Sequence, residues 1–504
     1  MAAGELAGAA LGWELELGHG IVVRYLLGAD APYGNPAVRL VTPAAARLTW
    51  RHVEADGAMC LLPPGRSWAP LVLEEAVALV LRAIFAVVET NLRNPAGTDP
   101  VAARHRWVTG PQRIWSLFDP DSAAEAAVAG RAHRRWFVAA TRGELDTWLS
   151  HRELPAKQCA EARVVRIADI SELPTDLASL AGDQRAIVEA GGIIVWILSN
   201  DSGPLLFAAR LDSIGALARL RVDRADRGWI HERGGAGLSP AIAGSHVAIV
   251  GCGSLGSGVA DLLARAGVGR LTLIDPEALS WDNVARHVLG GESVGRHKAE
   301  ALARRLGAQL PAMPAATGHV QSWQRLAAEQ PAALAADLVL STTAAWPEEL
   351  GLAEWCSARE IPLILGWVEG RAAAGHALSL QGQCLACHFS AGGRFLREVA
   401  IWEEANPVRL ADACHEFYLP YGYADIVPVQ GLIARLALAV LGGTSTAAAH
   451  WALVPSPAMV ESLGAACSPD WVRLQGAGRG ETPWSERHLS LEPSSNCWLC
   501  GAAG

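Results

Sequence analysis

Two pairs of cysteines have the spacing of a metal-binding site. "CLAC" carries Cys384 and Cys387, and "CWLC" carries Cys497 and Cys500. A Cys-x-x-Cys turn supplies two thiolates to one metal ion, and Zn²⁺ takes four soft ligands in a tetrahedron. The two pairs therefore predict one structural Zn²⁺ site that joins distant segments. A redox-active pair is the alternative, although neither pair stands in a thioredoxin-like pattern.

A glycine-rich turn indicates a nucleotide site. Gly251, Gly253 and Gly256 lie in "GCGSLG", between an apolar strand pattern and a helical pattern. These glycines permit a tight turn and a close approach of phosphate to the N-terminus of the helix. Asp275 ends the next apolar strand, where a carboxylate can accept hydrogen bonds from ribose hydroxyls. An NAD-dependent dehydrogenase and an ATP-using enzyme both fit these four residues.

The stretch after Asp275, "DPEALSWDNVARHVLGGESVGRHKAEAL", carries Asn283, Arg286 and Lys298. With the glycine turn, these residues resemble the adenylation domain of E1 ubiquitin-activating enzymes and their bacterial ThiF and MoeB relatives. The shared pattern is G-x-G-x-x-G, then D, then N-x-x-R, then K, and it covers about residues 230 to 504. The resemblance implies that ATP and Mg²⁺ are used to adenylate the C-terminal glycine of a ubiquitin-like protein.

The charges suit that reaction. A carboxylate that attacks the α-phosphate builds negative charge on the phosphate oxygens, which Arg286 and Lys298 would neutralise together with Mg²⁺. The resemblance gives Asn283 a hydrogen bond to phosphate or ribose. It places an Mg²⁺-binding Asp within "DLVLSTTAAW", where Ala344 stands instead, while Asp337 lies at the strand start. Some relatives add an arginine from before the first strand, and three candidates occur here: Arg221, Arg224 and Arg233.

Cys414 lies in a polar stretch, "NPVRLADACHEFYLPYGYAD", ahead of an apolar helical run. E1-family relatives carry their thioester or persulfide cysteine at about this place, between the first Cys-x-x-Cys pair and that helix. His415 and Arg409 are near enough in sequence to lower the pKa of the thiol. The resemblance therefore implies a nucleophile, and the alternative is a solvent-side thiol.

Cys60 follows a polar turn in "RHVEADGAMCLL". Most free cysteines are small buried apolar residues. However, residues 10 to 105 resemble the E2 ubiquitin-conjugating domains, in which a histidine, a D-G turn, the active cysteine and a W-x-P follow one another. The His-Pro-Asn sequence of many E2 enzymes is replaced here by His52, Val53 and Glu54. The matching residues are His52, Gly57, Cys60, Leu61, Trp68 and Pro70.

Three regions must position these residues. Residues 1–150 combine alternating strand patterns with one long apolar helical run, and we predict an α+β E2 (UBC-like) domain. Residues 151–230 mix strand-like and charged stretches and are assigned to a connector domain. Residues 231–504 begin strand, turn, helix, strand, which predicts a Rossmann-like E1 adenylation domain with a mostly parallel sheet and helices on both faces. The expected fold class is α/β multidomain.

The composition is that of a core-forming globular protein, with 504 residues of which 51% are hydrophobic and 18% charged. A net charge of -9, without a Lys/Arg-rich block, argues against nucleic acid or an anionic membrane as the main partner. Neither a signal peptide nor a charge-free apolar run of about 18 residues is predicted. Ten cysteines do not form a disulfide scaffold, so we expect a cytoplasmic protein.

An E2-like region followed by an E1-like region resembles the E2–E1 fusion enzymes of bacterial antiphage operons, including the cyclic-nucleotide CBASS systems. The resemblance implies a relay in which an activated C-terminus moves to Cys414, then to Cys60, and finally to an amine on a target protein. The carrier would be a ubiquitin-like protein or a cGAS-like nucleotidyltransferase, and a homodimer is expected. The family also includes sulfur-carrier adenylyltransferases, which do not need Cys60.

Two further alternatives remain. The E2-like domain is a docking module in the first, and the chain is an NAD-linked oxidoreductase in the second. Hydride transfer leaves Arg286, Lys298 and both cysteine pairs unexplained. The sequence shows no His-x-His metalloprotease signature, so no deconjugating activity is predicted.

Overall fold

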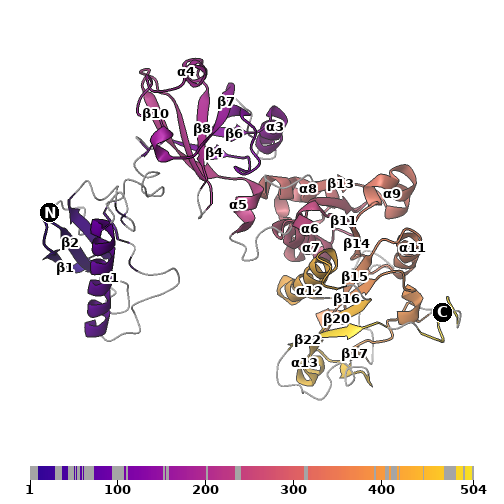
Figure 1. Ribbon diagram of the computed structural model, residues 1–504. Helices are drawn as coiled ribbons and strands as arrows, with labels where there is room; N and C mark the ends of the chain where they lie inside the picture. Colours follow the sequence, from indigo (N-terminus) through magenta and orange to yellow (C-terminus); the bar gives the residue numbers. More distant parts are fainter. Residues whose placement is uncertain are drawn as a thin grey trace. The chain divides into compact units, whose positions relative to one another are not determined.

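The computed structural model divides into two units, Met1–Thr147 with Leu154–Asp226 and Trp148–Glu153 with Arg227–Gly504 (Figure 1). Each unit is described by itself. The structure describes residues 9–28, 37–43, 50, 53, 57–59, 61, 73–93, 107–108, 112–150, 154, 158–199, 203–232, 240–310, 316–390, 393–402, 408–409, 417–418, 420–445, 448–469, 484–491 and 494–501.

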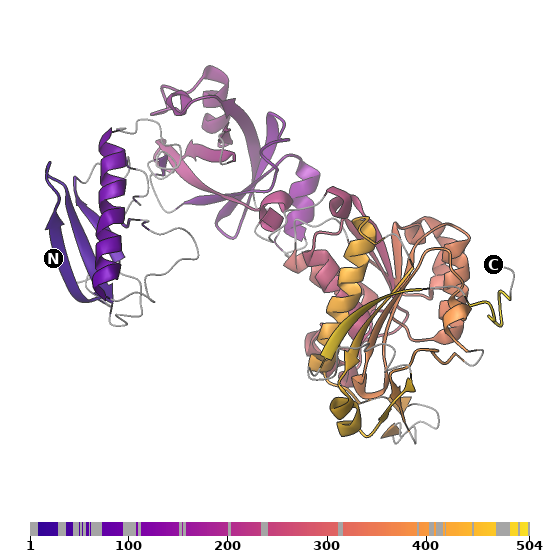
Figure 2. The same ribbon diagram turned by 60° about the horizontal axis from the view of Figure 1, so that its bottom comes forward.

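The first unit begins with a three-stranded antiparallel sheet covered by one long helix (Figures 1 and 2). Val80, Ile84 and Val88 recur every four residues on the helix, and they are buried against strand residues such as Val23 and Leu40. This spacing puts the three side chains on one face. The predicted strands and helix are confirmed as β1 (Ala9–Glu16), β2 (Val22–Gly28), β3 (Ala37–Thr42) and α1 (Leu73–Arg93).

The same unit contains a closed barrel with the strand order β10-β4-β6-β5-β7-β8-β9. Apolar side chains from every strand fill its core. The boundary expected near residue 150 falls inside this barrel, because strands on both sides of it pair with each other. The strands are β4 (Arg113–Ser116), β5 (Ala126–Ala132), β6 (Arg135–Ala139), β7 (Gln158–Ile167), β8 (Ile193–Leu198), β9 (Leu205–Leu211) and β10 (Leu217–Arg224), with helices α3 (Arg142–Ser150) and α4 (Gly182–Glu189) between them in sequence. Helix α5 (Arg227–Glu232) begins the main segment of the second unit.

The second unit is built on an eight-stranded sheet with the order β13-β12-β11-β14-β15-β16-β20-β22. The first five strands are parallel and the last three antiparallel, which confirms the expected mostly parallel sheet in this region. The strands are β11 (His246–Val250), β12 (Arg270–Ile274), β13 (Ala316–His319), β14 (Leu338–Ser341), β15 (Leu363–Val368), β16 (Gly375–Leu380), β20 (Ala449–Pro455) and β22 (Trp484–Ser490).

Helices cover both faces of this sheet, and each face has its own core (Figures 1 and 2). Val259 and Leu263 lie in one core, and Leu326 and Cys356 lie in the other. Cys356 is a buried apolar residue of the second core. The first face carries α7 (Ser254–Arg265), α8 (Lys298–Gln309) and α12 (Tyr423–Leu441), and the second carries α9 (Trp323–Glu329) and α11 (Trp346–Ser357).

Among the described residues, α12 alone is long and apolar enough to cross a membrane. Its apolar side chains pack against α7, β15 and β16, so burial in a core explains its composition. Gln430 of α12 lies directly over Gly258 of α7, where an added Cβ would come within 2.3 Å of all three terminal atoms of the amide group. Gly258 therefore permits the close packing of the two helices.

Candidate active site

The glycine turn connects β11 to α7 at the carboxyl end of the sheet. Gly251 has a φ of +88°, a left-handed conformation that favours glycine. A Cβ on Gly256 would lie 1.9 Å from the carbonyl oxygen of Gly251. Gly253 is the N-cap of α7, and nothing lies within 4 Å of its would-be Cβ. The turn thus leaves open space before the first amide groups of a helix, which is where an anionic phosphate binds best.

Asp275 is held beside this turn. Its Oδ2 accepts a hydrogen bond from the backbone N–H of Cys252 at 2.7 Å, and its Oδ1 accepts one from Glu277 at 2.8 Å. Burial has the largest effect on Asp275 and raises its pKa above the usual value. The two hydrogen bonds and the charge of Lys298 act in the opposite direction but do not outweigh burial. Each oxygen keeps a second lone pair that can accept from a hydroxyl group.

Lys298 is the first residue of α8 and is buried, with 5% of its surface exposed. Its Nζ lies 2.5 Å from Oε2 of Glu277. Glu277 therefore connects Lys298 to Asp275, since its backbone and its carboxylate contact one each. The structure brings Lys298, Asp275 and the glycine turn together around Cys252.

Arg286 and Asn283 lie in the short helix η3 (Trp281–Arg286) that follows β12. The Arg286 guanidinium is 5.2 Å from the centre of the Tyr421 ring, and the Tyr421 hydroxyl is 3.0 Å from Oγ of Ser254 at the start of α7. Tyr421 thus connects Arg286 to the phosphate end of α7. The Asn283 side chain bonds locally to Ser280 and Asp282.

Three contacts around the turn were not predicted from the sequence. His287 donates from Nε2 to the carbonyl of Cys252 at 2.6 Å, because its Nδ1 accepts from Leu289. The Gln430 side chain donates to the carbonyl of Ser254 at 2.8 Å. The third contact is that of the Tyr421 hydroxyl with Ser254. In the sequence, the only signal for Gln430 is that it is a glutamine within an apolar helix, and His287 and Tyr421 have no such signal.

Ala344 follows β14 and has a φ of +53°. A carboxylate stands beside it, since Oε1 of buried Glu349 accepts hydrogen bonds from Ser341 Oγ at 2.9 Å, Thr343 Oγ1 at 3.1 Å and Ala344 N at 3.2 Å. Burial raises the pKa of Glu349. Asp337 lies at the opposite end of β14, where it bonds the backbone N–H of His246 at 2.8 Å. Asp337 is thus a strand-edge residue that joins β14 to β11.

The four predicted zinc ligands converge. The Sγ atoms of Cys384, Cys387, Cys497 and Cys500 all lie within 4.8 Å of one another, with 4.0 Å between Cys384 and Cys497 and 3.6 Å between Cys387 and Cys500. Zn–S bonds of about 2.3 Å in a tetrahedron give S–S distances of about 3.8 Å. Burial raises the pKa of Cys497, but hydrogen bonds from backbone amides outweigh it and bring the pKa to about 7. The four thiols fit a Zn²⁺ ion.

Both predicted nucleophiles, Cys60 and Cys414, lie outside the described residues. Met59, next to Cys60, is buried and donates to the carbonyl of Val38 on β3 at 2.8 Å. Cys414 lies in the connection between β18 (Val408–Arg409) and β19 (Phe417–Tyr418), which pair antiparallel. Also outside the described residues are His52, Trp68, Pro70, Arg233 and His415.

The other arginine candidates belong to the first unit. Arg221 pairs with Asp223 at 3.0 Å, and Arg224 pairs with Asp226 at 2.8 Å. Both are thus engaged in ion pairs within the barrel. Their role toward a nucleotide stays a prediction.

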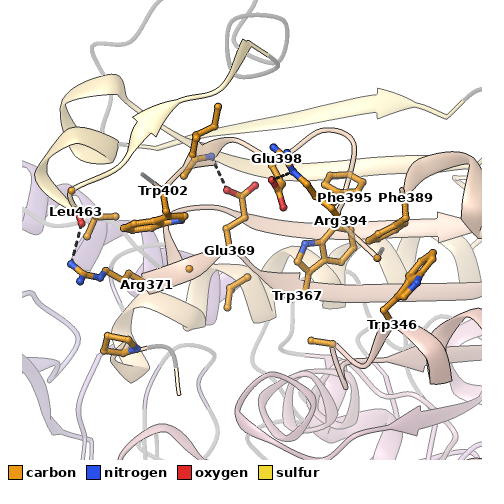
Figure 3. A pocket seen from close by; sticks show the side chains of 18 of the residues that line it. Trp346, Trp367, Glu369, Arg371, Phe389, Arg394, Phe395, Glu398, Trp402 and Leu463 are labelled. Atoms are coloured by element: carbon orange, nitrogen blue, oxygen red, sulfur yellow. Dashed lines mark hydrogen bonds and ion pairs between the residues drawn. The ribbon is translucent and has the colours of Figure 1, made fainter. Parts of the chain in front are cut away.

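A cavity of about 1070 Å³ adjoins the turn after β14 (Figure 3). Ala344 lines it, and the preceding residues contact the glycine turn: Thr342 Oγ1 donates to the Gly251 carbonyl at 2.8 Å. Trp402 and Pro420 also line it. These two residues flank the segment that carries Cys414.

The site thus combines a glycine turn at a helix N-terminus, a buried acid after the second strand and a lysine that begins the next helix. Residues 231–449, somewhat less than half of the chain, match the ThiF family.

Individual relatives are similar to parts of this chain. The chain is 28% identical over 233 residues to the ATP-dependent ubiquitin transferase-like protein Cap2 of Pseudomonas aeruginosa. This match covers 43% of the present chain and 40% of Cap2. The chain is also 32% identical over 151 residues to the adenylyltransferase and sulfurtransferase MOCS3 of Bos taurus. This match covers 29% of the present chain and 31% of MOCS3. The match thus spans less than half of either curated relative. The structure of E. coli MccB is 15% identical, with a TM-score of 0.35, and the match covers 52% of this chain and 66% of that one.

Proposed function

We propose that this chain uses Mg-ATP to adenylate the C-terminus of a ubiquitin-like or other carrier protein. The observation that carries the proposal is the grouping of Asp275 and Lys298 around the glycine turn, within the region that matches the ThiF family. In this reaction the carrier carboxylate attacks the α-phosphorus, an acyl–phosphate bond forms, and pyrophosphate leaves. Lys298 and Arg286 neutralise the charge that develops on the phosphate oxygens. Asp275 accepts hydrogen bonds from ribose, and Asn283 in η3 adds one to phosphate or ribose.

Mg²⁺ would neutralise phosphate charge when bound. We assign its carboxylate contact to Glu349, since Ala344 cannot supply one. All described hydrogen bonds to Glu349 reach Oε1, and Glu349 lines the cavity beside Ala344. A buried carboxylate whose pKa is raised by desolvation gains more from a nearby cation than an exposed one does.

The proposal continues with acyl transfer. The Cys414 thiolate attacks the adenylate carbonyl and releases AMP, the Cys60 thiolate then displaces Cys414, and a target amine displaces Cys60 as an amide forms. Trp402 and Pro420, which flank the Cys414 segment in the sequence, line the same cavity as Ala344, and this supports the transfer step. Conjugation in antiphage defence, a homodimer and a cytoplasmic location complete the proposal.

The test replaces Cys60 by serine, expresses the protein together with its neighbouring genes, and measures the intact mass of the protein by mass spectrometry. A serine oxyester survives where a thioester is lost. We expect an added mass equal to one neighbouring protein, which disappears when Cys414 is also changed to alanine. If only Cys414→Ser traps an adduct, the first region is a docking module.

Sulfur-carrier adenylation is the second candidate, favoured by the match to MOCS3. It predicts that carrier-dependent exchange of labelled pyrophosphate into ATP needs neither Cys60 nor its domain, and that the carrier ends as a thiocarboxylate. Mass analysis of the released carrier separates the two candidates.

A further inference from the structure

The cavity next to Ala344 has one strongly aromatic wall. We define the aromatic cluster as Trp346, Trp367, Phe389 and Phe395. The rings of Trp346 and Phe389 stack with centres 4.6 Å apart, and Trp367 meets Phe395 edge-on at 4.9 Å. Figure 3 shows the cluster at one end of the cavity, Trp402 and Arg371 at the other, and Glu369 between them.

Contacts on the side away from the cavity fix the Trp367 ring of the aromatic cluster. Trp367 stacks on His376 at 4.9 Å, and His376 donates from Nε2 to Oε1 of Glu369 at 2.8 Å. The two Glu369 oxygens also accept from the backbone amides of Val399 and Ala400 at 2.7 and 2.8 Å. The Trp367 ring is therefore fixed before any ligand arrives, which lowers the entropic cost of binding.

Two of the three acidic groups of the cavity already have partners. Glu369 has three donors, and Glu398 pairs with Arg394 at 2.7 Å. The third, Glu349, accepts its described hydrogen bonds through Oε1 and keeps Oε2 for the Mg²⁺ contact proposed above. The aromatic cluster thus offers apolar ring surface to an occupant. A basic side chain in the occupant would gain less here than an apolar one.

The position of the cluster sets which residue of the occupant it contacts. Trp346 is two residues from Ala344, so their Cα atoms are at most about 7 Å apart. Ala344 is two residues from Thr342, whose hydroxyl donates to the Gly251 carbonyl in the glycine turn. An extended tail rises about 3.3 Å per residue. A side chain against Trp346 therefore belongs to one of about the last three residues before the reacting carboxylate.

We propose that the cavity binds the C-terminal tail of the carrier and selects a large apolar side chain, aromatic or leucine-sized, within about three residues of its terminal carboxylate. This inference rests on the proposed function. The volume of about 1070 Å³ agrees with it, because a tail of glycines alone would leave most of that space unfilled.

The test measures fluorescence anisotropy of fluorescein-labelled hexapeptides with free carboxyl ends on the full chain. SGSSFG, SGSFAG and SGFSAG place phenylalanine at successive positions, and SGSSAG is the matched control. Burial of one phenylalanine side chain corresponds to about tenfold to hundredfold tighter binding. We expect that ratio for at least one of the three peptides over the control. Equal binding of all four peptides would overturn the inference.

Variants connect the effect to the cluster. Trp367→Leu and Phe395→Leu should each reduce the ratio to below about threefold. Trp355→Leu is the matched control, because Trp355 is half-buried against the same core but does not line the cavity, and it should leave the ratio unchanged. Thermal unfolding of each variant confirms that it folds. A ratio that survives both cluster variants would contradict the assignment.

Pyrophosphate exchange with the same peptides separates this inference from the proposed function. Exchange that is equal for all peptides would support activation and refute the selectivity. Phenylalanine-selective binding without any exchange would refute activation and leave the selectivity intact.

Discussion

Replacing Gly256 by alanine should distort the glycine turn more than any other single methyl group. The added Cβ would lie 1.9 Å from the Gly251 carbonyl oxygen and 2.5 Å from Thr342 Oγ1. Because real Cβ contacts stay beyond 3.0 Å, the backbone must move by more than 1 Å. Overpacking of this kind costs about 1–3 kcal/mol of unfolding free energy, and a displacement of about 1 Å at a reacting centre costs about 10²-fold in rate.

The assay for Gly256→Ala is carrier-dependent exchange of labelled pyrophosphate into ATP, together with urea unfolding. Gly431→Ala is the matched control: Gly431 lies within α12 with nothing within 4 Å of its would-be Cβ. Alanine there should keep the exchange rate and add up to about 1 kcal/mol of stability. Wild-type exchange and wild-type stability in Gly256→Ala would refute the idea that the turn requires this close approach.

Four further predictions follow from the site. Lys298→Met should lower the rate of pyrophosphate exchange by about 10²–10³-fold, since it removes the buried cation; an unchanged rate would remove Lys298 from the mechanism. Glu349→Gln keeps an acceptor for Ser341, Thr343 and Ala344 but loses the charge, so the Mg²⁺ concentration for half-maximal exchange should rise about tenfold, and an identical Mg²⁺ titration would contradict the assignment. Atomic emission should find one zinc ion per chain. Trp498→Phe removes the 3.0 Å hydrogen bond from Trp498 to the Phe389 carbonyl. It should weaken the binding of the phenylalanine-containing peptides several-fold, while the zinc content stays at one ion per chain. Burial and the charges of Lys298 and Arg305 hold the pKa of His287 below its usual value. As the pH falls through about 6.5, the unfolded chain gains a proton that the folded chain does not, so the free energy of unfolding falls by up to about 1.4 kcal/mol per pH unit for this group. Urea unfolding between pH 7.5 and 5 should therefore show a smaller change of unfolding free energy with pH in His287→Gln than in wild type.

The sequence alone identified the parts of the site whose geometry is local. Gly251, Gly253 and Gly256 are required by a single turn, and Asp275 and Lys298 follow it at fixed steps of one strand–turn–helix unit. The two Cys-x-x-Cys pairs likewise carry their spacing within one turn each, and the structure brings their thiols together. Chain spacing predicts such residues because few backbone conformations separate them.

Tertiary structure decided the rest, because the partners are far apart in the chain. Tyr421 and Gln430 reach Ser254 across 167 and 176 residues. The barrel closes by pairing β4 with β10, which no local pattern announces, so a boundary drawn from composition at residue 150 divides it. The aromatic cluster forms only when β15, the loop that follows Cys387 and α11 converge, since the sequence shows its four rings merely as apolar residues in separate elements.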